Sequence, residues 1–125
     1  MRRALRTLTT LLGALFALQG FVWIADPGRA AVGLGMSLLD GVALSTQIGD
    51  LSALFFTAGA TMLVGARPGR ARLLYVPMGL FGVAAVARML AWALHGAAFA
   101  ATFIAIEVVM AALLLAAARR LDAEG

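Results

Sequence analysis

Four long apolar runs, separated by short polar breaks, dominate the pattern of this chain. Each run is close to the roughly 20 residues that an α-helix needs to cross a hydrocarbon core about 30 Å thick. Backbone polar groups find no partner in lipid, so only helices or closed barrels span it, and runs this continuous are not the alternating strands of a barrel. The sequence therefore predicts an all-α fold in which residues 1–125 form one integral membrane four-helix bundle. The predicted spans cover residues 8–24, 48–66, 73–94 and 97–118.

Turn-forming residues occupy the breaks between these runs. Asp-Pro-Gly at residues 26–28 ends the first run, Arg-Pro-Gly-Arg at 67–70 separates the second from the third, and His95-Gly96 predicts a tight hairpin before the fourth. The segment at about 30–47 is apolar but interrupted by glycines and an aspartate, so it is too short and too broken for a fifth span. It predicts an outer interfacial loop over the mouth of the bundle, or a short helix there.

The arginines outside the spans predict the orientation. With four alternating helices, eight arginines share the side of the N-terminus and one lies on the opposite side. The positive-inside rule then places both termini in the cytoplasm, N-in and C-in, and we expect a multi-pass protein of the bacterial cytoplasmic (inner) membrane. A cleaved signal peptide is the alternative for the first run, although no convincing small-residue cleavage site follows it. The eight are Arg2, Arg3, Arg6, Arg67, Arg70, Arg72, Arg119 and Arg120, and the ninth is Arg29.

Composition narrows the chemistry. The chain is 63% hydrophobic and 13% charged, against about 45–50% and 25% in soluble domains. It has no cysteine, no lysine and one histidine, which excludes thiolate chemistry, Schiff bases and multi-histidine metal sites, so we expect no metal and no cofactor. The net charge of +4 does not indicate nucleic acid, because the arginines adjoin apolar runs. Their expected partner is the lipid bilayer and its anionic headgroups.

Three ionisable residues interrupt the apolar runs and form the candidate site. Charged residues in a span cost about 2.5–3.5 kcal/mol each on insertion scales and persist when paired. A rise of ~1.5 Å per residue puts Asp50, Arg88 and Glu107 about 3, 9 and 15 Å below the outer ends of their predicted helices. Arg88 can then bridge both carboxylates, since its donors fan out in a plane. The sequence predicts this ion cluster inside an outward-facing pocket, with Trp92 and His95 at its rim; Trp92 and Trp23 also suit the outer aromatic belt.

Three interpretations of the cluster stay open at this point. It is a structural bridge between the third and fourth helices, a site for a small molecule or a proton-linked carboxylate, or a contact with a partner subunit. Small residues add a packing prediction, because Gly59, Gly79 and Gly82 would let helices two and three approach closely.

The third and fourth helices also resemble a known family. Residues 82–90 (Gly-Val-Ala-Ala-Val-Ala-Arg-Met-Leu), His95-Gly96 and residues 106–108 (Ile-Glu-Val) are similar to the bacterial membrane proteins of domain of unknown function 4345, and more loosely to DoxX-like proteins. The resemblance implies four helices, an arginine late in the third and a glutamate within the fourth; Asp26-Pro27 also fits it. Helix two departs from the arginine and Tyr-Gly-Gly-like turn of that family. No activity is assigned to the family, so the resemblance implies a fold and not a function.

Three functions compete on these grounds. The favoured one is a non-enzymatic accessory or ligand-binding bundle with no catalytic residue, which would hold a small hydrophobic ligand. The alternatives are a small proton-coupled transporter that uses Glu107, and a membrane enzyme acting on a lipid, sterol-like substrate or quinone with Glu107 or Asp50 as acid and base. Proton transfer needs a group released from its ion pair. The expected pairing of Glu107 with Arg88 therefore disfavours both alternatives.

Overall fold

The computed structural model describes residues 1–123, and these residues are mostly helical, with no strand among them. Four helical stretches are long and apolar enough to cross a membrane, which agrees with the four apolar runs. Only 22–33% of the most apolar window of each is buried inside the protein, so most of their apolar surface faces outward, as lipid requires. In chain order the elements are α1 (Arg2–Ala25), α2 (Pro27–Gly33), α3 (Gly41–Gly65), the 3₁₀ turn η1 (Ala71–Leu74), α4 (Tyr75–His95) and α5 (Ala101–Asp122).

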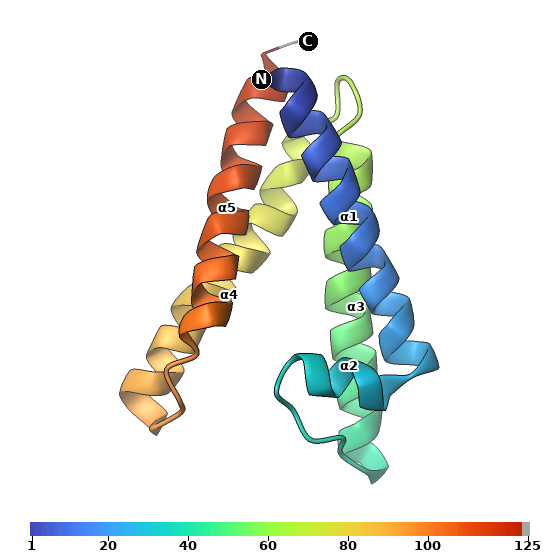
Figure 1. The fold of residues 1–125 in the computed structure, drawn as a ribbon, viewed down its shortest axis with the longest axis vertical. Coiled ribbons are helices and arrows are strands. Elements are labelled where there is room, and N and C mark those ends of the chain that lie inside the picture. The colour runs from blue at the N-terminus through green and yellow to red at the C-terminus, as the bar shows by residue number, and fades with distance from the viewer. Residues whose placement is uncertain (124–125) are drawn as a thin grey trace.

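The helices form two arms that meet at one end and diverge toward the other (Figure 1). One arm is α1 packed along α3, and the other is α4 packed along α5. The arms meet where the N-terminus, η1 and the end of α5 lie, and α2 lies across the opposite, open end of the α1–α3 arm (Figure 1).

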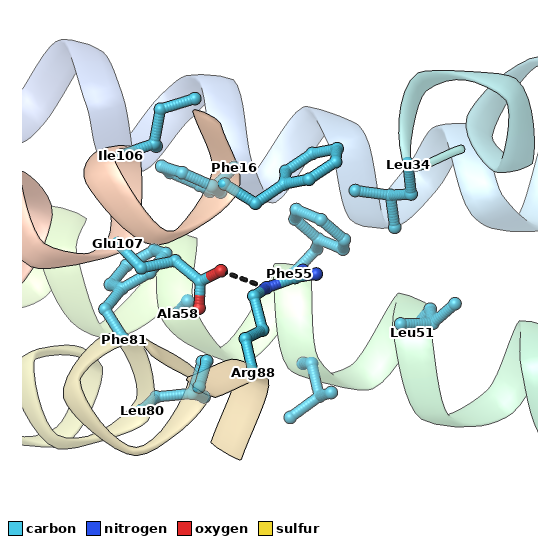
Figure 2. A pocket seen from close by; sticks show the side chains of 13 residues that line it. Phe16, Leu34, Leu51, Phe55, Ala58, Leu80, Phe81, Arg88, Ile106 and Glu107 are labelled. Atoms are coloured by element: carbon cyan, nitrogen blue, oxygen red, sulfur yellow. Dashed lines mark hydrogen bonds and ion pairs between the residues drawn. The ribbon is translucent and has the colours of Figure 1, made fainter. Parts of the chain in front are cut away.

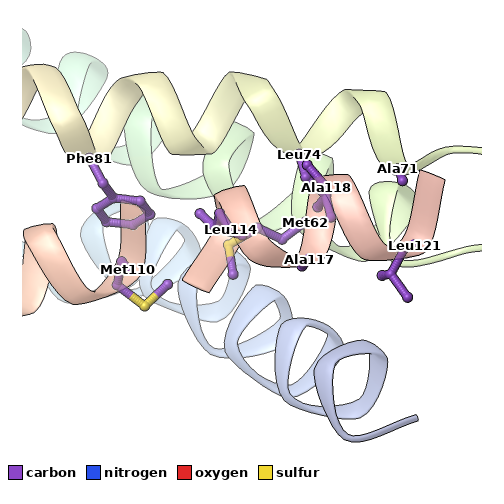
Figure 3. Close-up of a cluster of buried hydrophobic side chains, with 9 residues drawn as sticks. All are labelled: Met62, Ala71, Leu74, Phe81, Met110, Leu114, Ala117, Ala118 and Leu121. Carbon is purple, nitrogen blue, oxygen red and sulfur yellow. The ribbon is translucent and has the colours of Figure 1, made fainter. Parts of the chain in front are cut away.

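The joined end holds the main hydrophobic core. Met62, Leu74 and Leu114 are fully buried there and bring α3, η1 and α5 together (Figure 3). Arg6 donates a hydrogen bond from Nε to the carbonyl of Ala66 at 2.9 Å, which satisfies one of the unpaired carbonyls at the end of α3. Burial and capping therefore hold the two arms together at this end. The remaining core residues are Ala71, Phe81, Met110, Ala117, Ala118 and Leu121.

Glycines make the α1–α3 arm tight. A Cβ atom on Gly59 would lie 2.2 Å from the backbone nitrogen of Ala17, so only glycine lets the two backbones come this close. The expected close approach of helices two and three is wrong, because the glycine contacts of α3 go to α1. Gly79 and Gly82 of α4 have nothing within 4 Å of an added Cβ atom.

Several predicted helix boundaries are also wrong, and α1 begins at Arg2 instead of residue 8. The second spanning helix begins at Gly41 instead of residue 48, and the segment at 30–47 divides into α2, a non-helical stretch at 34–40 and the first two turns of α3. Buried Gln47 holds the non-helical stretch at 34–40 against the start of α3. It accepts a hydrogen bond from the N–H of Leu39 and donates one to the carbonyl of Ser37, each at 3.0 Å. The last helix begins at Ala101 instead of residue 97, because Gly96 caps the end of α4 in a left-handed conformation and residues 97–100 are not helical.

Candidate functional site

The candidate site centres on Arg88 of α4 and Glu107 of α5. Arg88 lies seven residues before the end of α4 and Glu107 six residues after the start of α5, so both lie about 9–11 Å from the open ends of their helices. Nε of Arg88 donates to Oε1 of Glu107 in an ion pair (Figure 2). The structure thus brings this predicted pair together, and the later start of α5 puts the two residues at nearly the same level.

The two partners differ in exposure. The side chain of Glu107 is 9% exposed and that of Arg88 is 38% exposed. The guanidinium carbon of Arg88 also lies 4.7 Å from the ring centroid of Phe103, a cation–π contact that favours the charged arginine where water is scarce. Arg88 is therefore held from two sides by α5.

Part of the hydrogen-bonding capacity of the pair is unused. Oε2 of Glu107 is buried and has no hydrogen-bond partner among residues 1–123. Arg88 has five N–H donors, of which the structure commits only the one on Nε within the same part of the chain. A buried carboxylate oxygen without a donor is unfavourable by roughly 1–3 kcal/mol or more, so this site favours an added donor.

These groups open into a cavity of about 290 Å³ between the two arms. Arg88 and Glu107 are the only ionisable groups on its described wall, and the other lining side chains are apolar or aromatic. All four spanning helices contribute, and Leu34 closes one side from the stretch after α2 (Figure 2). The apolar lining comprises Phe16, Leu34, Leu51, Leu54, Phe55, Ala58, Leu80, Phe81, Ala84, Phe103 and Ile106.

Asp50 does not join this cluster. Because α3 begins at Gly41, Asp50 lies about 13 Å along the helix instead of the expected 3 Å. It is exposed, forms no ion pair with any residue in the described range, and lines a neighbouring hollow with Ala53 and Thr57. Leu54 and Leu80 line both hollows and lie between them. The predicted three-membered cluster is therefore a pair, with Asp50 outside it.

Trp92 and His95 do not line the cavity either. Trp92 is 52% exposed and packs edge-on against Phe99, with ring centroids 5.2 Å apart, which helps fold residues 97–100 back along the end of α4. His95 is exposed in the last turn of α4. The prediction that Trp92 and His95 form the rim of the pocket is therefore wrong, because both lie nearer the open end of α4 than Arg88 does and outside the cavity lining.

Sequence reasoning missed the aromatic wall of the site. Phe16 of α1 stacks on Phe55 of α3 at 5.9 Å and meets Phe81 of α4 edge-on at 5.1 Å, so it connects the two arms beside the ion pair. Nothing in the sequence distinguishes these phenylalanines from the other apolar residues of their runs.

Trp23, expected at the outer interface, is instead fully buried beneath α2 against Ala30.

Comparisons with protein-family models, with curated proteins and with solved structures found no match. The resemblance to domain of unknown function 4345 therefore stays a prediction.

Chemically, the described site offers an apolar chamber with one polar spot, the Arg88–Glu107 ion pair. No group of three or more acidic or histidine side chains in residues 1–123 lies close enough together to hold a metal ion.

Proposed function

We propose that this chain is a non-enzymatic protein of the bacterial cytoplasmic membrane, with both termini in the cytoplasm, that binds a single-chain amphiphile between its two arms. The observation that carries the proposal is a cavity whose walls are apolar except for the Arg88–Glu107 pair. Ligand sites in proteins combine such walls with a few placed polar groups that fix the orientation of the ligand. The hydrocarbon chain would lie against the aromatic wall and the polar head at the ion pair.

The size of the cavity supports a small occupant. Its volume of about 290 Å³ lies at the lower end of the roughly 300–1,000 Å³ typical of small-molecule sites. A molecule with one alkyl chain or one ring system suits that volume better than a whole two-chain phospholipid does. The arms diverge toward the open end (Figure 1), and we expect a ligand to enter the cavity there from the surrounding bilayer.

The arginine distribution supports the orientation. Eight arginines flank the joined end of the arms and one lies at the open end, so under the positive-inside rule the cavity faces the outer leaflet. A ligand drawn from that leaflet would reach Arg88 and Glu107 after entering by about 10 Å, given ~1.5 Å per helical residue.

The pairing of Glu107 with Arg88 disfavours acid–base catalysis by Glu107, because proton transfer needs a group that is free to reach its substrate.

Photo-crosslinking tests this proposal. The probe is a single-chain lipid with a diazirine near the end of its alkyl chain, added to the protein in lipid nanodiscs. We expect crosslinks to concentrate on the cavity wall, and Ala84→Trp, which fills the cavity, to abolish them. Val83→Trp is the matched control, because this neighbouring side chain is 69% exposed and does not line the cavity. Equal labelling of all outward faces, unchanged by Ala84→Trp, would overturn the proposal.

A further inference from the structure

We infer that the cavity selects an electrically neutral amphiphile whose head carries both a hydrogen-bond donor and an acceptor, such as an alkyl alcohol or a monoacylglycerol. This inference rests on the proposed function and names the ligand class for the same site. The ion pair of Arg88 and Glu107 supports it in two ways. The two charges match, and among residues 1–123 Oε2 of Glu107 has no hydrogen-bond donor.

Charge matching excludes a charged head. An arginine and a carboxylate in contact sum to zero, and the other cavity-lining residues bring no further ionisable group. An anionic or cationic head would therefore add a third, uncompensated charge within an apolar chamber, where an unpaired charge is strongly disfavoured. The carboxylate of α3, Asp50, does not line this cavity and lines the neighbouring hollow with Leu54 and Leu80 instead.

The unfinished hydrogen bonds require a polar head. Oε2 of Glu107 is buried without a donor among residues 1–123, so an O–H or N–H group of an occupant completes it where the head displaces the side chains that cover this oxygen. The terminal nitrogens of Arg88 offer donors to an acceptor beside it. A hydroxyl both donates and accepts, so one hydroxyl head can complete the carboxylate and accept from the guanidinium at once. A plain hydrocarbon completes neither.

A head-group competition measures this selectivity. The photoactivatable probe is displaced in nanodiscs by four competitors of equal chain length: lauryl alcohol, dodecane, dodecanesulfonate and dodecyltrimethylammonium. We expect the alcohol to compete at least about tenfold more strongly than the other three, since one hydrogen bond to a charged group is worth about that factor or more. The two ionic competitors carry permanent charges, so the comparison does not depend on pH.

A charge variant sharpens the test. Glu107→Gln keeps the size of the side chain but leaves Arg88 as the only charge, so we expect the preference to move from the alcohol to the sulfonate by about tenfold or more. Asp50→Asn is the matched control, because it removes a carboxylate of α3 that lies outside the cavity, and we expect the wild-type preference to persist.

The outcomes separate the two proposals. Equal competition by all four compounds, with crosslinks still confined to the cavity, would overturn the inference and leave the proposed function standing. Preference of the wild type for either ionic head would also overturn it. Crosslinks that ignore the cavity would overturn both. Should Glu107→Gln fail to fold, the selectivity of the wild-type protein decides the inference by itself.

Discussion

Replacing Arg88 by leucine should destabilise the protein more than replacing both members of the ion pair. The single change leaves Glu107 in place, with a side chain that is 9% exposed and an oxygen, Oε2, that already has no donor among residues 1–123. Arg88→Leu with Glu107→Leu removes both charges and fills the space with apolar atoms. Substitutions of that kind in buried pairs are often neutral or stabilising.

The structure also sets an order among the single variants. Removing one partner of a buried pair costs about 3–5 kcal/mol in soluble proteins, and we expect Arg88→Leu to lie at the lower end, about 3 kcal/mol, because the Arg88 side chain is partly exposed. Glu107→Leu should cost less, about 1–2 kcal/mol, because Arg88 is 38% exposed and keeps its contact with Phe103. The loss of that cation–π contact, about 0.5–1 kcal/mol, occurs in both Arg88 variants and cancels in the coupling energy.

The assay is reversible unfolding in mixed detergent micelles, followed by the helical circular dichroism signal of the wild type, both single variants and the double variant. We expect the double variant to lie within about 1 kcal/mol of the wild type, which gives a coupling energy of roughly 4–5 kcal/mol from the losses of the two single variants. Asp50→Leu is the control, since this carboxylate is exposed and unpaired among the described residues, and its removal should not destabilise the protein. Additive losses, with the double variant as poor as the sum of the singles, would refute the reasoning.

Three further predictions concern packing and topology. Gly59→Ala should destabilise the α1–α3 arm by about 2 kcal/mol or more in the same unfolding assay, because its Cβ would lie 2.2 Å from a backbone nitrogen of α1, whereas Gly79→Ala, with open space around it, should be neutral or slightly stabilising. Gln47→Leu should speed hydrogen exchange in residues 34–40 without affecting α1, and unchanged protection there would contradict the bracing role of Gln47. Reporter fusions after Gly96 and at the C-terminus should report opposite sides of the membrane; reports from the same side would exclude the proposed topology.

The parts of the fold set by local pattern were predictable. Runs of about 20 apolar residues identify spanning helices whatever their neighbours, and all four appear. Arg88 and Glu107 lie on consecutive helices joined by a short connection, so a contact between them needs only antiparallel packing of α4 on α5. The pair follows from the high cost of an unpaired charge in a span.

The parts set by long-range packing were not predictable. The start of α3 depends on the hydrogen bonds that Gln47 makes with Ser37 and Leu39. Which side of α3 faces the pair depends on how the helices pack, and Asp50 lines the neighbouring hollow instead. The cavity depends on the arms being joined at one end only and on Phe16 meeting two other helices. No spacing within a single apolar run encodes which arm a helix joins, since every face of it is apolar.

The most direct test of the central claim is a structure of the protein extracted together with the lipids of its native membrane. We expect elongated density between the two arms, with its polar end within hydrogen-bonding distance, about 3 Å, of Oε2 of Glu107. An α4–α5 arm closed onto the α1–α3 arm, with the space filled by the protein's own phenylalanines, would contradict the claim. Density whose polar end points away from Arg88 and Glu107 would contradict it equally.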